Sequence, residues 1–281
     1  MQFPIKFSKM SGAGNDFIVI DHRRPLFADA AAVRSFARAA CERKFSVGAD
    51  GLILIEDTPE ADFRWQFFNA DGSPAEMCGN GARCAARFAY NRGIAPARMH
   101  FVTQAGIIEA EVVGTTVALT MTPPENLQLD LRLDDPDGGE QTVHLVNTGV
   151  PHAVLFVDDL DAAPIRRWGR HFRFHPRFAP AGANVNFVGL GGGQDQALRV
   201  RTYERGVEDE TLACGTGAVA AALVAGALDR AAAPTRIITS GREELVIHYH
   251  RQGAEFSGVR LEGPADFIYD GQLHAEALRR G

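Results

Sequence analysis

The sequence reads CGNGA at residues 78–82 and CGTGA at residues 214–218, so the second motif repeats the first at an offset of 136. Each motif leads into an alanine-rich stretch, and we predict helices over about residues 79–92 and 215–230. Asn69 lies nine residues before Cys78, and Arg205 lies nine before Cys214. NDFIVID at 15–21 matches HAVLFVD at 152–158 at an offset of 137. Several matches at nearly one offset predict two duplicated domains.

Short β-like segments bounded by Gly, Pro, Asn and Asp occupy much of the remaining chain. We predict strands at residues 17–20, 52–55, 65–68, 107–113, 116–121, 143–146, 153–157, 198–203 and 245–249. Residues 109–119 are typical of a hairpin around Gly114-Thr115, and a further helix is expected over about residues 30–43. Because the strands cluster instead of alternating strictly with helices, the pattern favours an α+β fold over a doubly wound parallel sheet.

The best candidate linker is TPPEN at residues 122–126, since two consecutive prolines cannot continue a helix or a central strand. DDPDGG at 134–139 and GGG at 191–193 predict loops. A length of 281 residues allows two domains of ordinary size. We therefore predict a first domain over residues 1–123 and a second over residues 124–265.

Composition narrows the class of protein. The 35 acidic residues outnumber the 29 basic ones, which argues against a nucleic-acid partner. Four cysteines are too few for a disulfide-stapled secreted domain. The N-terminus does not look like a signal peptide, and the longest apolar run, at 215–228, is shorter than the roughly 20 residues of a membrane span. We expect a cytoplasmic protein with no membrane partner, in which this run is a helix buried on all sides.

Cys78 and Cys214 each precede a glycine-rich turn that opens a predicted helix. Backbone N–H groups and the helix dipole favour the thiolate there, and the pKa is expected to fall below the ~8.5 of a free thiol. The same N–H groups can bind a carboxylate. If two such thiols face one carbon acid, one removes its proton and the other returns a proton from the opposite side, which inverts the stereocentre. Cys41 and Cys84 lack this context, and we interpret them as structural.

Other chemistries fit the sequence less well. His248 and His250 share a predicted strand, but no third zinc ligand accompanies them. No lysine follows Lys44, so a Schiff base with pyridoxal phosphate has poor candidates. A Cys–His hydrolase that uses His152 leaves the second motif unexplained. A binding or redox protein with a reversible Cys78–Cys214 disulfide remains an alternative.

Six segments carry a family resemblance. They are SGAGNDF at 11–17, FNADGS at 68–73, MCGNGARC at 77–84, ANVNFV at 183–188, YERG at 203–206 and ETLACGTGA at 210–218. In this order, over nearly the whole chain, the sequence resembles the diaminopimelate epimerases, whose wider superfamily includes proline racemase.

The resemblance implies two pseudo-symmetric α+β domains, each a β-barrel-like sheet around a central helix. It also implies that the tail, about residues 266–281, returns to the first domain. The implied reaction interconverts LL- and meso-2,6-diaminopimelate in lysine and peptidoglycan precursor biosynthesis. It would use no metal or pyridoxal phosphate, and the family often forms homodimers.

Individual positions follow from the resemblance. Cys78 and Cys214 match the two catalytic bases, with His152 in a supporting role. The turns that hold the reacting carboxylate match Gly79, Asn80, Gly215 and Thr216. The residues that match substrate-binding positions are Asn15, Asn69, Asn186, Glu204 and Arg205. Taken singly, each of these polar residues also fits an ordinary turn or surface position.

Two departures from the family pattern concern the end of the substrate that does not react. Val150 stands where many members have Asn, and Gly51 stands where some have Gln. A racemase of another amino acid on the same fold therefore remains a second alternative.

Overall fold

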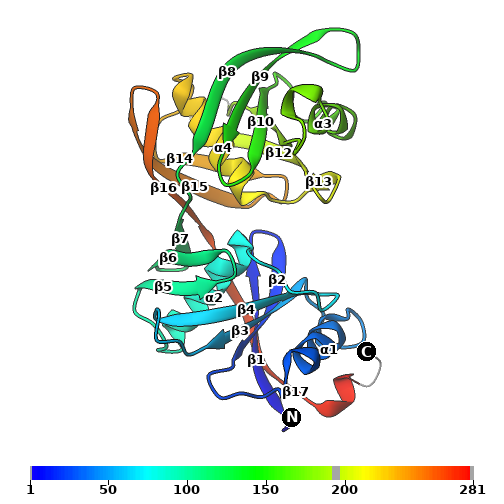
Figure 1. Cartoon of the computed structure of the whole chain (residues 1–281), viewed down its shortest axis with the longest axis vertical. Coiled ribbons are helices and arrows are strands. Elements are labelled where there is room, and N and C mark those ends of the chain that lie inside the picture. Colours follow the sequence, from blue (N-terminus) through cyan, green and yellow to red (C-terminus); the bar gives the residue numbers. More distant parts are fainter. Residues whose placement is uncertain (1, 192–196, 279–281) are drawn as a thin grey trace. The chain divides into compact units, whose positions relative to one another are not determined.

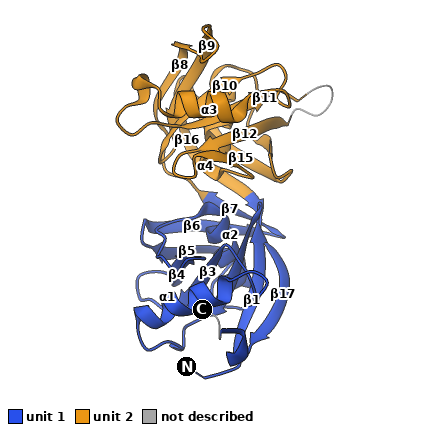
Figure 2. Cartoon of the chain, turned by 90° about the vertical axis from the view of Figure 1, so that its right-hand side faces the viewer, with its two compact units in different colours: residues 1–119, 263–281 blue, residues 120–262 orange. Residues whose placement is uncertain are grey.

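The computed structural model describes residues 2–191 and 197–278. The chain divides into two units: unit 1 is residues 1–119 with 263–281, and unit 2 is residues 120–262 (Figure 2). The domain ends predicted at residues 123 and 265 lie within four residues of these limits, and we retain the two-domain division as a proposal. Residues 192–193 of the predicted glycine loop and 279–281 of the predicted tail lie outside the described residues.

In unit 1, one continuous series of paired strands forms the sheet. Its spatial order is β17 (Asp266–Leu273), β1 (Ile5–Gly12), β2 (Asn15–Asp21), β3 (Gly51–Glu56), β4 (Phe63–Asn69), β5 (Arg98–Thr103), β6 (Gly106–Val113) and β7 (Thr116–Thr120). Pairs β2–β3 and β4–β5 are parallel, and the other adjacent pairs are antiparallel. The β6–β7 hairpin turns at Gly114-Thr115, as predicted.

Unit 2 repeats this arrangement. Its order is β8 (Glu125–Asp134), β9 (Glu140–Asn147), β10 (Pro151–Phe156), β11 (Asn184–Gly189), β12 (Leu198–Glu204), β14 (Thr235–Thr239), β15 (Glu244–Gln252) and β16 (Glu255–Pro264), with the short β13 (Asp209–Thr211) also on β12. The parallel pairs, β10–β11 and β12–β14, occupy the same places in the series as those of unit 1. The α+β prediction and the internal repeat are confirmed.

A helix lies against the sheet in each unit. In unit 1, α2 (Gly79–Asn91) contacts β1, β2, β3 and β6, and in unit 2, α4 (Gly215–Ala227) contacts β9 to β12, β14 and β15. Figure 1 shows α2 in cyan and α4 in yellow, each enclosed by the strands of its unit. Every residue of α4 from Gly217 to Gly226 is buried, which confirms the predicted buried helix. No helix among the described residues is long and apolar enough to cross a membrane.

The other face of the unit 1 sheet is covered by α1 (Ala30–Cys41), which begins where Asp29 accepts a hydrogen bond from the Ala32 N–H, a common helix start. Ile18 of β2 packs in one core with residues of α1, whereas Phe17 approaches Gly81 of α2. Because helices cover both faces, the central residues of β2 and β3 are buried in succession. This explains why these strands read as continuous apolar runs instead of alternating.

Two sequence predictions need correction. The helix α3 (Ile165–Arg173) in unit 2 was not predicted, because Gly169 and four arginines interrupt its apolar pattern. Gly169 is required there, since a Cβ would lie only 2.5 Å from the Cβ of Tyr203. The linker is also shorter than TPPEN, because β8 begins at Glu125. Bulges in β8, with a positive φ at Asn126, obscure its alternation.

Candidate active site

Both motif cysteines are the N-cap residues of the central helices. Cys78 precedes α2 with extended backbone angles (φ −147°, ψ 116°), and Cys214 precedes α4 with φ −122° and ψ 109°. Their carbonyls accept the first helical hydrogen bonds, from Ala82 at 2.8 Å and Ala218 at 2.9 Å. Both cysteines are thiols outside any disulfide, and both are half-buried. Each unit therefore places one thiol at the positive end of a helix dipole.

The thiol of Cys214 does not have the lowered pKa expected from its helix position. Burial raises its pKa to about 11, and the charge of Glu204 adds to this rise. The Thr216 hydroxyl, 3.6 Å from the sulfur, and the backbone N–H groups of Gly217 and Thr216 act in the opposite direction. Lost hydration outweighs these donors, which favours the protonated form of the Cys214 thiol at neutral pH. Burial likewise raises the pKa of Cys41 and of Cys84 to about 12, as befits structural thiols.

This raised pKa predicts slow alkylation of Cys214. In a Cys78→Ala variant, the rate with iodoacetamide is expected to rise about tenfold per pH unit from pH 7 to 10, because only the thiolate reacts. Glu204→Gln should speed the reaction several-fold at pH 8 by removing a nearby negative charge. Asp209→Asn is the matched control, since this β13 carboxylate pairs with Arg166 instead. Peptide mass spectrometry would measure the rates, and a plateau near pH 7 would contradict the assignment.

In unit 1, the structure brings Asn15 and Asn80 together. Asn80 Nδ2 donates to Asn15 Oδ1 at 2.8 Å, and Asn15 Nδ2 donates to Asp50 Oδ2 at 2.9 Å. Asn69 lies at the end of β4, where its amide donates to Ser73 Oγ at 3.0 Å within a turn. Asn69 is paired in register with Gly51 of β3. Asn15 and Asn80 thus belong to one network, while the Asn69 side chain bonds within its own turn.

The packing around Gly51 explains why this chain lacks a longer side chain at that position. A Cβ at this position would lie 2.6 Å from Phe67 Cε2 and 2.8 Å from the carbonyl oxygen of Phe68. Contacts this short do not occur at real Cβ atoms, so the Phe67 ring occupies the space that a longer residue would need. The glycine is therefore a requirement of this chain's own packing.

A charged cluster next to Asn15 was missed from the sequence. Arg43 contacts Asp16 at 2.5 Å and Asp50 at 2.9 Å, and Lys9 contacts Asp16 at 2.7 Å. Although burial acts to raise it, the hydrogen bonds from Arg43 and Lys9 hold the pKa of Asp16 below its ordinary value. The cluster fixes the turn before β3 against the start of β2. Its sequence signal was the pair of aspartates in the motifs NDF and GADG.

In unit 2, Asn186 of β11 is completely buried, and its amide is engaged. Its Nδ2 donates to His152 Nδ1 and to the Ala153 carbonyl, both at 3.1 Å, and its Oδ1 accepts from Thr202 at 2.9 Å. A Cβ on Gly217 would overlap Asn186 Oδ1. In this structure Asn186 therefore supports the first turn of α4.

His152 supports Asn186 in turn. The ring is buried, and its Nδ1 accepts the hydrogen bond from Asn186, which leaves Nε2 without a hydrogen-bond partner among the described residues. Burial, and then the nearby charge of Arg205, lower the pKa of His152 to about 3. The imidazole is thus neutral at physiological pH and orients the Asn186 amide, and its supporting role in the reaction remains a prediction.

Asn184 is a second residue that sequence reasoning missed. Its Oδ1 accepts from the Arg205 backbone N–H at 2.8 Å, and its Nδ2 donates to the Pro151 carbonyl at 3.3 Å. It lies two positions before Asn186, so both side chains share one face of β11. This alternation was visible in ANVNFV. Glu204, next to Arg205, accepts from Thr211 Oγ1 at 2.8 Å, which links the end of β12 to the segment before Cys214.

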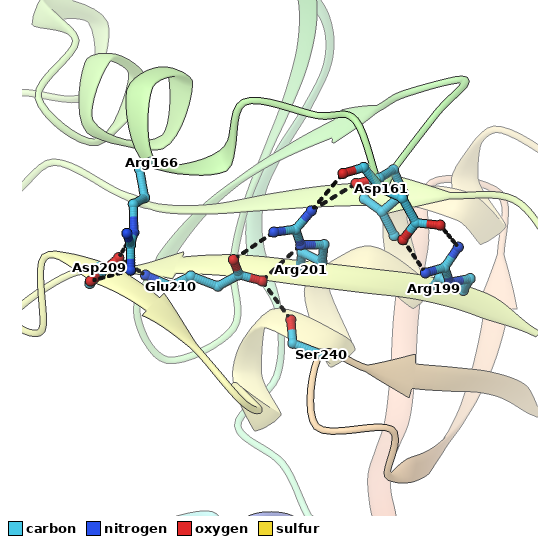
Figure 3. Close-up of polar contacts among 8 residues, drawn as sticks. Asp161, Arg166, Arg199, Arg201, Asp209, Glu210 and Ser240 are labelled. Carbon is cyan, nitrogen blue, oxygen red and sulfur yellow. Dashed lines mark hydrogen bonds and ion pairs between the residues drawn. The ribbon is translucent and has the colours of Figure 1, made fainter.

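A network of arginine–carboxylate pairs holds that segment (Figure 3). Arg201 of β12 makes a bidentate pair with Glu210 of β13, at 2.8 and 2.7 Å, and Ser240 donates to the same carboxylate at 2.9 Å. Arg166 of α3 pairs with Asp209 at 2.7 Å. Bidentate pairs fix orientation as well as distance. The strand that leads to Cys214 is therefore anchored on both sides.

A possible metal-binding group in the described part of the chain is formed by Asp134, His171 and His175, whose ligand atoms lie within 4.8 Å of one another. Its hydrogen bonds argue against a metal. His175 Nδ1 accepts from the Arg177 N–H, so in the neutral ring the proton is on Nε2, which faces Asp134 at 3.0 Å. His248 pairs with Glu262 at 2.9 Å.

Comparison with known proteins agrees with this arrangement. The family model described as diaminopimelate epimerase matches residues 7–127 and 144–268. A diaminopimelate epimerase of Aquifex aeolicus is 44% identical over 98% of this chain and 99% of its own length. One from Hydrogenobaculum sp. is 45% identical over 96% and 98%.

Two solved structures share the fold. A phenazine biosynthesis protein of the PhzF family from Bacillus anthracis matches with a TM-score of 0.71 at 15% identity, over 97% of this chain and 100% of that chain. A probable proline racemase from Agrobacterium radiobacter matches with a TM-score of 0.63 at 18% identity, over 96% and 93%. At such identities the likeness concerns the fold alone. Together with the two-domain epimerase-like fold, the family match over both halves and the relatives at 44% and 45% identity show that the chain belongs to the diaminopimelate epimerase family.

Proposed function

We propose that this protein is a diaminopimelate epimerase, an isomerase that interconverts LL- and meso-2,6-diaminopimelate in lysine and peptidoglycan precursor biosynthesis. The observation that carries the proposal is the repeated placement of a cysteine at the N-cap of the central helix in each unit, within a chain of this family. A reaction that inverts one carbon needs one base and one acid, and the duplication supplies two chemically matched thiols.

The chemistry follows from the protonation of Cys214. Because burial and the charge of Glu204 raise the pKa of Cys214, we assign the thiolate at the start of one direction to Cys78. Its sulfur takes the α-proton, the electron pair remains on the α-carbon, and Cys214 gives its proton to the opposite side. The product then leaves a protonated Cys78 and a Cys214 thiolate. The reverse reaction uses the same groups with exchanged roles, so atoms and charge balance without a cofactor.

Carbanion character needs stabilisation at the reacting carboxylate. Gly79 and Asn80 supply backbone N–H groups at the first turn of α2, and Gly215 and Thr216 supply them at α4. Such preorganised donors favour negative charge as it develops. Each turn can bind a carboxylate by the general chemistry of helix N-termini, and the proposal assigns both turns to the carboxylate that reacts.

The distal amino-acid group needs a cation and an anion of the protein. The guanidinium of Arg205 suits a bidentate carboxylate contact, and Glu204 suits the ammonium. Asn69 supplies a further polar contact in this assignment. Asn184 takes the place of the predicted Asn186, whose side chain is completely buried and already engaged within the protein. A cytoplasmic location and a homodimer remain predictions from the sequence and from the family resemblance.

The test is α-proton exchange. The reduced protein is incubated with LL- or meso-diaminopimelate in heavy water, and α-deuterium and stereochemistry are followed by NMR. Deuterium incorporation with inversion is expected. A folded, reduced protein that exchanges no α-proton of diaminopimelate would refute the epimerase proposal. Exchange with another amino acid instead would identify a different racemase, and a thiol-dependent redox response without exchange would identify the redox alternative.

A further inference from the structure

In unit 1, a chain of hydrogen bonds runs between two charged groups through Asn80, in the first turn of the helix that follows Cys78. Arg83 Nη2 donates to Asn80 Oδ1 at 2.8 Å, Asn80 donates to Asn15 at 2.8 Å, and Asn15 donates to Asp50 at 2.9 Å. A guanidinium can only donate hydrogen bonds, and a carboxylate can only accept them. The two ends therefore fix the direction of every hydrogen bond between them.

Arg83 is the unexpected member of this chain. It is fully buried, and a buried guanidinium loses a large hydration free energy that its contacts must offset. Nε donates to the Pro264 carbonyl at 3.2 Å, and Nη1 lies 3.5 Å from the carbonyl of Gly79, the residue after Cys78. At the motif offset of 136, the equivalent position is Val219, which is buried in α4. The first half-site thus has a cation where the second has an apolar residue.

The direction of the chain determines what the two amides can offer a ligand. Asn80 Oδ1 already accepts from Arg83, and Asn15 Oδ1 already accepts from Asn80. Among the hydrogen bonds between described residues, each amide uses only one of its two hydrogens. The remaining hydrogen is a donor, which can bind an acceptor such as a carboxylate oxygen but not an ammonium group. Both amides therefore favour a carboxylate over an ammonium.

We propose that Arg83 is a positioning residue for the epimerase reaction, which orients Asn80 and Asn15 so that their remaining amide hydrogens bind a substrate carboxylate. This inference rests on the proposed function. Arg83 contacts no reacting atom in the proposal and acts through the two asparagines. Without it, Asp50 still orients Asn15 from the other end of the chain. Asn80 Oδ1 loses its charged donor, however, and the Asn80 amide is then held only by its hydrogen bond to Asn15.

The test compares Arg83→Met with Arg87→Met. Arg87 is the matched control, because it lies one turn further along α2 and donates to the next carbonyl, Ala265, at 2.5 Å, whereas its hydrogen bonds among the described residues do not include Asn80. Arg83→Met should raise the KM for diaminopimelate about 10- to 100-fold, the effect of losing hydrogen bonds to a charged group, with a smaller change in kcat. Arg87→Met should leave KM within about twofold of the wild type. Equal KM values in the two variants would overturn the proposal.

The KM of an Asn80→Asp variant and the side-chain amide NMR signals test the same hydrogen-bond chain independently. Asn80→Asp retains Arg83 and all its contacts but cannot donate to Asn15, so it should raise KM similarly even if Arg83→Met fails to fold. A wild-type KM in Asn80→Asp would overturn the directional chain. The side-chain amide NMR signals of Asn15 and Asn80 should shift in Arg83→Met and not in Arg87→Met, whether or not the protein is an epimerase. Unshifted signals in both would overturn the inference, while absent wild-type exchange would refute only the proposed function.

Discussion

Replacement of either Cys78 or Cys214 by alanine is expected to lower epimerisation about 10²- to 10⁴-fold, because each variant lacks one of the two proton-transfer groups. Two independent thiols should also differ in which stereoisomer they deprotonate. A single remaining thiol can still remove a proton from its own side and return one to the same side. Each variant should therefore exchange the α-proton of at most one stereoisomer with heavy water, without inverting it, and the two variants should prefer opposite isomers.

The matched control for this experiment is Cys41→Ala, which removes a buried thiol from α1. It is expected to cost about 1 kcal/mol of stability and to leave kcat unchanged. Stereochemistry would be followed by chiral chromatography and exchange by NMR. Inversion at the wild-type rate in either motif variant would rule out the two-base assignment. Loss of exchange with both isomers in a folded variant would indicate that the thiols do not act independently.

The repeated motif predicted the two central helices, and the short apolar segments predicted much of the sheet. CGNGA and CGTGA each begin a helix at the predicted residue, and every strand predicted from apolar segments overlaps an observed one. Strands could be predicted from these segments because their apolar composition alone indicates that they are buried. The repeat offset also predicted two duplicated domains, and the identical order of parallel and antiparallel pairs in both units supports that prediction.

The missed helix α3 shows that apolar periodicity does not identify a helix with few buried residues. Its residues, IRRWGRHFR, are mostly basic, and only Ile165, Gly169 and Phe172 are buried. The duplication did contain the signal: α1 lies between the second and third strands of one repeat, and an offset of 136 places its counterpart at residues 166–177. Applying the repeat offset to α1, instead of treating each segment alone, would have predicted α3.

For the polar residues of the site, the sequence predicted which positions belong to it but not the hydrogen bonds between them. Asn15 and Asn80 were named as binding residues, but their connection through Arg83 and Asp50 depends on hydrogen bonds between segments far apart in sequence. Asn186 was named and Asn184 was not, although both lie on one face of β11. The raised pKa of Cys214 was unpredictable for a similar reason, because tertiary burial opposes the local effect of the helix N-terminus.

Gly217→Ala is expected to be the most damaging single methyl addition near the second thiol. Its Cβ would overlap Asn186 Oδ1. Hydrogen bonds to His152 and Thr202 hold the Asn186 side chain in place, so it cannot easily move away from the added methyl group. Overpacking of this kind costs about 1–3 kcal/mol of stability. A displacement of the turn by about 1 Å can cost about 10²-fold in rate. We therefore expect a lower melting temperature and a kcat/KM reduced by about two orders of magnitude.

The duplication provides the control for this variant. Gly81 is the counterpart of Gly217 in α2, but the three atoms nearest to its added Cβ would be side-chain carbons of Ile53, Trp65 and Phe17, at 3.3 to 3.5 Å. Both substitutions gain the same helix propensity, about 1 kcal/mol, so the difference between the two variants isolates the clash with Asn186. Adding Asn186→Ala to Gly217→Ala should then cost less than the sum of the single changes. Equal stability and activity of Gly81→Ala and Gly217→Ala would show that the buried asparagine does not determine the position of the Cys214 turn.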